Sequence, residues 1–455
     1  MRNFLRSVPP VARQMDRLLL LMTTTTYRAS AFLEAARRLA VPVVVGSDRD
    51  QVLAVANPGG HLTLDFLAPE EASRAIVEFA RRYPIRAVVS ADDDGAILGA
   101  MAAAALELPH NSVDAVAAAC SKRRTREVLA AAGAPSPRFA VISIDDDPGD
   151  VAGQVSFPCV VKPLFLSASR GVIRANDRVE FIAAFDRLAA ILHRPEVAAQ
   201  GGPLARQVLV ETYIPGVEVA VEGLLSRGQL RVLAIFDKPD PLEGPFFEET
   251  IYVTPSRLAA SVQQAIVACT AQAVAALGLE HGPIHAELRV NDQGPWILEV
   301  APRSIGGLCS RALRFGEGIP LEELILRHAM GLEVDSLIRE RQAAGVMMIP
   351  IPQAGILNEV RGQPEAQRVE GIEEIRLTVP VGQEVIPLPE GARYLGFIFA
   401  RDATPERVEA ALREAHSRLT FLIRRPEEPP EGESAGSRVS AAARMRAAAR
   451  IQGSS

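Results

Sequence analysis

Two acidic residues, Glu287 and Glu299, occupy neighbouring apolar stretches that are predicted to form a β-hairpin. The stretches His285–Arg289 and Trp296–Val300 are joined by the turn-forming run Asn291–Gly294. In such a hairpin both carboxylates can lie on one face, close enough to share a cation. Carboxylate oxygens suit Mg²⁺ that bridges nucleotide phosphates, with Mn²⁺ as an alternative. The competing interpretation is a solvated hairpin face, which the flanking apolar residues disfavour.

An arginine follows the second acidic stretch, in the run Pro302–Gly307. Beside a metal-bound phosphate, Arg303 would neutralise charge that develops during phosphoryl transfer, and Gly306 and Gly307 would let backbone N–H groups approach an anion. Taken alone, such an arginine is more often a structural ion-pair partner. Its position four residues after Glu299 favours a role in holding a phosphorylated substrate.

A lysine, Lys162, ends an apolar strand-like run, and a loop of small residues follows at Ser167–Gly171. Lysine provides a point charge for phosphate oxygens, and a Ser/Gly loop can fold over a triphosphate and exclude water. Because buried strands seldom end in an unpaired lysine, Lys162 is predicted to bind a ligand. Ser167 and Ser169 fit a ligand contact and an ordinary loop equally well.

Three further positions have side chains that suit a site. In the segment Glu211–Glu218, backbone groups would face a purine edge and the Glu218 carboxylate would face ribose hydroxyls, although the segment is also typical of an ordinary strand–turn–strand. His285 would orient a substrate or relay a proton, but a lone histidine on an apolar strand is more often a core residue. Lys238, beside two prolines, is a candidate to meet a substrate carboxylate.

The first 120 residues contain the elements of an α/β domain. Strands are predicted at Leu18–Met22, Val41–Val45 and Ala87–Ser90, and helices at Ala29–Ala40, Pro69–Arg82 and Ala96–Leu106. Their alternation predicts a parallel sheet, at whose carboxyl edge ligands usually bind. The polar runs Thr23–Thr26 and Ser90–Asp94 fall at that edge, and they fit substrate contacts and helix caps equally well.

From Ser121 the pattern changes to α+β with antiparallel pairing, beginning with a basic helix at Lys122–Ala132. The later elements are predicted strands at Cys159–Lys162, Gln207–Glu211, Glu218–Leu225, Leu230–Asp237, Ile284–Val290, Trp296–Val300, Met347–Pro350, Ile375–Val379 and Tyr394–Ala400, with helices at Arg178–Leu192, Ser256–Leu277 and Pro405–Leu419. We therefore predict an α/β domain over 1–120, a central α+β domain over 121–344, a small closing α/β domain over 345–425 and a disordered tail over 426–455.

Composition restricts the partners and the compartment. The chain has 455 residues, a net charge of -6 and a pI near 5.8, which argue against nucleic acid as the main partner. Four cysteines lie far apart without zinc spacing, as expected in a reducing compartment. The apolar run Leu18–Met22 is far shorter than the roughly 20 residues that span a bilayer. We therefore expect a cytoplasmic protein with no membrane contact.

Taken together, these motifs resemble the ATP-grasp superfamily. Lys122, Lys162 with its Ser/Gly loop, the segment Glu211–Glu218 and the set Glu287, Glu299 and Arg303 occur in the family's order and approximate spacing. The resemblance covers roughly residues 120–320. It implies a two-lobed ATP-grasp domain, preceded by the usual α/β domain, with ATP and Mg²⁺ as cofactors.

The resemblance also implies residue roles. Glu287 and Glu299 would hold the metal, and Arg303, Lys162 and His285 would act in catalysis. Arg303, Gly306, Gly307 and Lys238 would contact the substrate. The implied nucleotide contacts are Lys122, Lys162, Ser167, Ser169, Gly171, Glu211, Thr212, Tyr213, Ile214, Glu218 and Leu298.

Within the superfamily, the third segment and the string Asp237–Glu249 are similar to the carboxylate–amine ligases, in particular to the L-amino-acid ligases that form dipeptides. The implied reaction forms an acyl phosphate from ATP and a carboxylate, and an amine then displaces phosphate. ADP and phosphate would be released. The substrates would be small molecules, amino acids among them, and a homodimer is the commonest assembly to expect.

Two positions depart from the family pattern. Ala301 stands where many relatives carry an asparagine, which puts a second Mg²⁺ in doubt, and Arg170 lies in a loop that usually has small residues. Arg170 would contact a phosphate or reach solvent.

Two rival functions stay open. One rival is biotin-dependent carboxylation, although no biotin-attachment sequence occurs. The other is a nucleotide-binding protein without catalysis.

Overall fold

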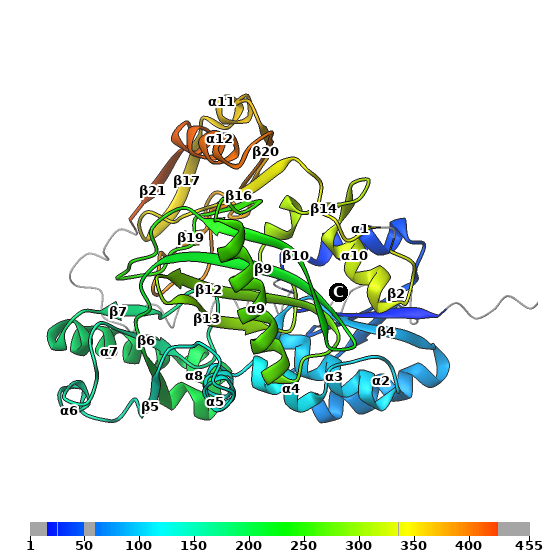
Figure 1. Ribbon diagram of the computed structural model, residues 1–455, viewed down its shortest axis with the longest axis horizontal. Coiled ribbons are helices and arrows are strands. Elements are labelled where there is room, and N and C mark those ends of the chain that lie inside the picture. The colour runs from blue at the N-terminus through cyan, green and yellow to red at the C-terminus, as the bar shows by residue number, and fades with distance from the viewer. Residues whose placement is uncertain (1–15, 25, 50–59, 335, 426–455) are drawn as a thin grey trace, which may run out of the picture.

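The computed structural model describes residues 16–24, 26–49, 60–334 and 336–425 (Figure 1). The first of its sheets is wholly parallel, in the order β3-β2-β1-β4. Leu18 and Leu20 of β1 point into one core and Leu19 and Leu21 into another, so this strand is buried on both faces. The elements are β1 (Arg17–Leu21), β2 (Val43–Ser47), β3 (His61–Thr63) and β4 (Ile85–Ser90), with α1 (Ala29–Arg38), α2 (Pro69–Arg82) and α3 (Ala96–Ala105).

A second, antiparallel sheet has the order β5-β8-β6-β7 and is covered by α7. Two helices, α4 and α5, lead into it from the parallel sheet. Phe181 and Phe185 of α7 pack with Val161 of β6 in the core of this lobe. The elements are α4 (Val113–Ala119), α5 (Lys122–Ala131), β5 (Phe139–Ser143), α6 (Pro148–Ala152), β6 (Cys159–Pro163), β7 (Ile173–Ala175), α7 (Arg178–Leu192), α8 (Pro195–Gly201) and β8 (Gln207–Thr212).

The largest sheet has eight strands in the order β13-β12-β9-β10-β11-β16-β20-β18. All of its pairings are antiparallel, as the sequence predicts for the middle of the chain. Helix α9 packs against β13 at one end, and α12 packs against β16 and β20 at the other (Figure 1). The elements are β9 (Val217–Ser226), β10 (Gln229–Lys238), β11 (Ile251–Thr254), α9 (Ala260–Leu277), β12 (Gly282–Asn291), β13 (Gly294–Ala301), β16 (Ala343–Ile349), β18 (Ile372–Leu377), β20 (Gly396–Asp402) and α12 (Pro405–Ser417).

This sheet runs across the predicted boundary at residue 344 without interruption. Residue pairs such as Val253 and Gly345 join β11 to β16. Gly345 is required there, because a Cβ would lie 2.7 Å from Val408 of α12. The third segment therefore extends the central sheet. That residues 345–425 form a separate closing domain stays a prediction.

The remaining elements are small. Strands β17 (Gly355–Arg361), β19 (Glu384–Val385) and β21 (Thr420–Arg424) form a three-stranded sheet near α11 (Gln363–Gln367), and β14 (Arg314–Phe315) pairs with β15 (Ile319–Pro320) ahead of α10 (Leu321–Ala329). The predicted tail over 426–455 lies outside the described residues, as does Thr25.

Among the described helices, α9 alone is long and apolar enough to cross a membrane by length and composition. One face of α9 is buried in the core of the central sheet, with Ile266, Ala273 and Leu277 at most 4% exposed. A core helix that packs on a sheet passes the same test of length and composition, so α9 is weak evidence for a membrane span.

Candidate active site

The three largest sheets contribute to one cavity of about 420 Å³, a volume typical of a small-molecule site. Both polar runs that follow strands of the parallel sheet reach it, through Thr23, Thr26, Asp92, Asp93 and Asp94. Of the residues predicted to form the site, the cavity is lined by Lys122, Lys162, Ser167, Ser169, Glu211, Thr212, Tyr213, Ile214, Glu218, His285, Glu287, Leu298, Glu299, Arg303, Gly306 and Gly307.

Glu287 of β12 and Glu299 of β13 are paired directly across the hairpin, so their side chains share one face and both line the cavity. The Glu299 carboxylate makes no ion pair or hydrogen bond with any residue that the structure describes. Two carboxylates this close repel each other unless a cation lies between them. The pair therefore fits a divalent cation with oxygen ligands such as Mg²⁺. Ala301, 3% exposed, offers no ligand atom.

Lys162 lies at the end of β6 with its ammonium 2.6 Å from Glu211 Oε2. The other oxygen of Glu211 accepts a hydrogen bond from Arg126 Nε at 2.7 Å. Burial raises the pKa of Glu211, but Arg126 and Lys162 outweigh burial and hold that pKa below its usual value. Burial also lowers the pKa of Lys162, and Glu211 offsets only part of this effect. Glu211 thus anchors the lysine that points into the cavity.

The loop Ser167–Gly171 lies over the same end of the cavity and is held from two sides. Lys122 Nζ donates to the Leu166 carbonyl at 2.8 Å. The Gly171 N–H donates to the Pro389 carbonyl at 2.9 Å, and Arg170 Nε donates to the Glu390 carbonyl at 2.9 Å. Arg170 thus has a contact that the sequence did not predict, and its two predicted alternatives, a phosphate contact or exposure to solvent, stay untested. Gly171 does not line the cavity, and its φ of +74° explains the glycine.

The segment predicted to read a nucleotide is fixed by an arginine from β12. Arg289 donates to Glu218 Oε2 at 3.0 Å, to the Tyr213 hydroxyl at 2.8 Å and to the Ile214 carbonyl at 3.0 Å. The guanidinium is 3% exposed, so burial strengthens these contacts. The Thr212 and Tyr213 N–H groups already donate to backbone carbonyls, so the backbone groups that remain available for a purine are fewer than the sequence implies.

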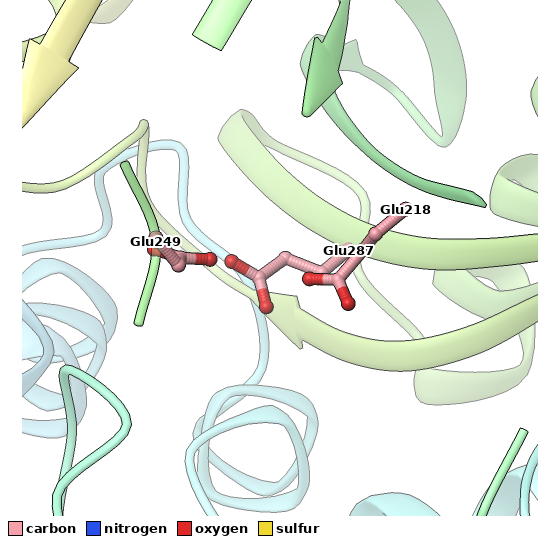
Figure 2. Close-up of side chains that lie close together, drawn as sticks. All are labelled: Glu218, Glu249 and Glu287. Atoms are coloured by element: carbon pink, nitrogen blue, oxygen red, sulfur yellow. The ribbon is translucent and has the colours of Figure 1, made fainter. Parts of the chain in front are cut away.

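Lys238 does not line the cavity. Its ammonium contacts three carboxylates, those of Glu218 at 2.8 Å, Glu287 at 3.2 Å and Glu249. Figure 2 shows the three glutamates drawn together, and their oxygens lie within 4.8 Å of one another. Lys238 therefore offsets part of the negative charge of this cluster.

Lys238 is not the only cation at these carboxylates, because Arg289 also pairs with Glu218 and His285 lies 3.5 Å from Glu287. Burial raises the pKa of Glu249 to about 7, an effect that Lys238 only partly opposes. Burial also raises the pKa of Glu287, but Lys238 and His285 outweigh it and keep that pKa well below the usual value. Glu287 is therefore the more firmly ionised carboxylate, as a metal ligand must be.

His285 is held by a glutamate that the sequence did not single out. Its Nδ1 lies 2.5 Å from Glu222 Oε1, and its Nε2 lies 3.5 Å from Glu287 Oε1. The other oxygen of Glu222 accepts from the Ile305 N–H at 3.1 Å. Burial lowers the pKa of His285, but Glu222 and Glu287 outweigh burial and raise the pKa to about 9. The imidazolium thus links the metal-binding hairpin to the loop that carries Arg303.

Arg303 lines the cavity and forms an ion pair with the parallel-sheet domain. Its Nη2 lies 2.6 Å from Asp93 Oδ2 in the loop after β4. Burial lowers the pKa of Arg303, but Asp93 and Glu299 outweigh burial and raise the pKa above its usual value. The neighbouring Ser304 carbonyl and hydroxyl accept from the buried Arg28.

Sequence reasoning missed Arg126, Arg289, Glu222, Glu249 and the aromatic residues of the cavity other than Tyr213. Glu222 and Arg289 had a readable signal, because Glu222 lies four residues after Glu218 and Arg289 two residues after Glu287, each pair on one face of a strand. The others are brought in by segments that are distant in the sequence.

Three family models match the chain. The model of the ATP-grasp domain matches residues 155–312, that of the ATP-grasp N-terminal domain matches residues 33–110, and that of the L-amino acid ligase C-terminal domain 2 matches residues 347–424.

Individual relatives agree with these models. The solved L-amino acid ligase from Bacillus licheniformis is 26% identical with a TM-score of 0.75, over 90% of this chain and 100% of that one. An uncharacterized protein of Sinorhizobium fredii is 24% identical over 92% of this chain and 85% of its own length. A D-alanine–D-alanine ligase of Aromatoleum aromaticum is 32% identical, over 46% of this chain and 64% of its own length.

The parallel domain, the two-lobed body and the acidic hairpin together define an ATP-grasp protein, and the chain belongs to that superfamily. Within it, the chain is a ligase of the carboxylate–amine branch that forms C–N bonds, similar to the L-amino-acid ligases.

Proposed function

We propose that this ligase joins the carboxylate of one small molecule to the amine of another through an acyl phosphate, with ATP as the phosphoryl donor. At least one substrate would be an amino acid, so that the product is an amide or dipeptide. The names of the Bacillus licheniformis and Aromatoleum aromaticum relatives support this substrate class.

One arrangement carries the proposal. The paired carboxylates of Glu287 and Glu299, the guanidinium of Arg303 and the ammonium of Lys162 all open onto the same cavity. Two anions and two cations at the walls of one cavity suit a metal-bound polyphosphate, whose charge would be matched on each side. A divalent cation held by Glu287 and Glu299 would supply a Lewis acid for phosphate oxygens.

The reaction then proceeds in two displacements. A carboxylate oxygen of the acid attacks the γ-phosphorus of ATP, the bond to the ADP oxygen breaks, and an acyl phosphate forms. Lys162 and Arg303 offset the negative charge on the transferring group. The amine then attacks the acyl carbon, inorganic phosphate leaves with the bonding pair, and the nitrogen loses a proton to solvent or a nearby base. Lys122 and the loop Ser167–Gly171 would cover the nucleotide and exclude water.

The test is ADP release by the full chain with MgATP and pairs drawn from the common amino acids, with the amide product identified by mass spectrometry. We expect ADP, phosphate and amide in equal amounts for at least one pair. ADP release with bicarbonate alone would replace the proposal by carboxylation. ATP binding without ADP release for any pair would replace it by a role without catalysis.

We also propose a cytoplasmic location and a homodimer. The four cysteines, Cys120, Cys159, Cys269 and Cys309, are free thiols, and three of them are buried. Free thiols are usual in a reducing compartment. Fractionation of cells tests the location, and light scattering of the purified chain tests the dimer.

A further inference from the structure

The turn formed by residues 387–392 lies between β19 and β20 in the third segment. The Gly391 N–H closes this turn by donating to the Pro387 carbonyl at 2.8 Å. A glycine is required there, because a Cβ on Gly391 would lie 1.8 Å from the Ile386 carbonyl oxygen. At the end of the turn, Ala392 lines the cavity. The turn thus has a fixed shape and reaches the edge of the candidate active site.

This turn supplies the two carbonyls that hold the loop Ser167–Gly171 from the third segment, those of Pro389 and Glu390. The conformation of the loop makes such support necessary. Ala168 and Ser169 have φ values of +53° and +55°, in the left-handed region that residues other than glycine seldom adopt. A loop with two such residues in succession would relax to other conformations unless its surroundings held it.

The turn is itself held by an ion pair with the lobe to which the loop belongs. Glu390 Oε1 accepts from Arg187 Nε at 2.7 Å, and Glu390 Oε2 accepts from Arg187 Nη2 at 3.0 Å. The Arg187 guanidinium, on α7, also lies over the Phe246 ring at 4.8 Å. Phe246 in turn forms a β-bridge with Ile173 of β7. We call Arg187, Glu390 and Phe246 the Arg187 latch, because they join three segments of the chain at one guanidinium.

We propose that the Arg187 latch holds the loop Ser167–Gly171 in place over the nucleotide, so that the third segment controls how tightly the ligase binds ATP and ADP. This inference rests on the proposed function, which places the nucleotide beneath that loop. A loop that is already ordered costs less free energy to fix when the nucleotide binds. Arg187 and Glu390 do not line the cavity, so they are positioning residues that act through the loop.

The expected effect is modest, because the side chains of Arg187 and Glu390 are 44% and 22% exposed. Arg187→Ala and Glu390→Gln should each raise the Kd for ADP and the KM for ATP by about two- to fivefold. The change in kcat should be smaller, because neither residue reaches the cavity. Salt screens a solvent-exposed ion pair, so the ratio of variant Kd to wild-type Kd should fall towards one as the salt concentration rises.

A charge exchange tests whether the two residues act as a pair. Arg187→Glu and Glu390→Arg each place like charges together, and each should weaken ADP binding more than the neutral variants do. The double variant restores opposite charges and should recover a Kd within about twofold of the wild-type value. Arg206→Ala is the matched control, because it removes an exposed ion pair with Asp145 in the same lobe, and neither of these residues lines the cavity. This control should leave the Kd for ADP unchanged.

Calorimetry of ADP binding in the presence of Mg²⁺, at low and at high salt, measures all of these variants in the full chain. Wild-type Kd values in Arg187→Ala and Glu390→Gln would overturn the inference, and so would a double variant without recovery. A fall in kcat with an unchanged KM for ATP would overturn it as well.

The binding measurement does not need turnover, so it separates the inference from the proposed function. ADP binding that responds to the latch, in a chain that forms an amide from no pair of substrates, would count against the proposed function alone. No ADP binding by the wild-type chain would overturn both.

Discussion

Arg303 and Asp93, 210 residues apart in the sequence, form an ion pair with 2.6 Å between Nη2 and Oδ2. The contact joins the loop after the metal-binding hairpin to the loop after β4 of the parallel sheet. The Arg303 guanidinium is thus oriented by Asp93, which belongs to a different part of the chain from Arg303. Asp93 is a positioning residue for Arg303 in this arrangement.

Asp93→Asn should lower kcat for ADP release about 10-fold or more, with a smaller change in KM for ATP. The amide cannot hold the guanidinium as firmly, and small misplacements of a charge-stabilising group are costly. Asp186→Asn, exposed on α7 and outside the cavity lining, is the matched control. Wild-type kcat in Asp93→Asn, beside an inactive Arg303→Ala, would show that Arg303 reaches its position unaided.

Glu299→Ala and Glu287→Gln should raise the Mg²⁺ concentration needed for half-maximal activity and lower kcat by about 100-fold. Each change removes one of two anionic ligands that face each other across the hairpin. Titration of activity with Mg²⁺ and with Mn²⁺ measures the effect, and Glu317→Gln on the exposed turn serves as the control. Full activity of Glu299→Ala at the wild-type Mg²⁺ midpoint would remove Glu299 from the site.

Glu211→Gln should lower the free energy of unfolding by about 3–5 kcal/mol, because it leaves Arg126 and Lys162 as uncompensated buried charges. The side chains of Arg126 and Glu211 are only 2% and 4% exposed. By contrast, Glu390→Gln breaks a more exposed pair with Arg187 and should cost at most about 1 kcal/mol. Denaturant unfolding of both variants measures the difference. If both variants lowered the free energy of unfolding by the same amount, burial of the ion pair would not set its contribution to stability.

Arg170→Ala should raise KM for ATP several-fold and change kcat less. The side chain ties the loop over the nucleotide end to the Glu390 carbonyl, and its loss frees a segment that must be ordered when ATP binds. Arg178→Ala, exposed at the start of α7, is the control. A fall in kcat with KM unchanged would indicate that Arg170 acts on the transferring phosphate instead.

The stability of the protein should fall as the pH drops from about 6.5 to about 4, in part through His328. Burial and the neighbouring His281, with ring centroids 4.6 Å apart, lower the pKa of His328 to about 4. In this range the unfolded chain binds a proton that the folded chain does not, so acid favours unfolding.

His328→Gln should reduce the loss of unfolding free energy between about pH 6.5 and about pH 4 by about 1 kcal/mol. This value is reduced because the ring is partly exposed to solvent. Unfolding midpoints of the variant and the wild type between pH 4 and 8 give the comparison. Parallel curves for the two proteins would show that His328 titrates normally in the folded state.

The bounds of a helix or strand were predicted most accurately where a single sequence pattern marks that element. Helices α2 and α7 begin and end at the predicted residues. A proline marks the start of α2, a polar residue precedes α7, and a long amphipathic repeat marks each helix. Strands β3 and β19 have three and two residues, too few for any periodicity, and were missed.

Most of the predicted site residues line one cavity, because short sequence motifs contain them, and their roles stay predictions. Ion pairs between distant segments, such as Arg126 with Glu211 or Arg303 with Asp93, leave no spacing to read in the sequence. Lys238 shows the limit of such reasoning, since a lysine beside a proline in the sequence became the centre of three carboxylates.

The unbroken pairing of β11 with β16 has a practical consequence for engineering. Exchange of the C-terminal region between relatives, as a route to new products, would replace three strands of the sheet that also supports the acidic hairpin. A graft made at residue 344 must therefore reproduce the hydrogen-bonding edge of β11 as well as the new binding surface. A fragment that stops there would expose that edge to other chains and should aggregate.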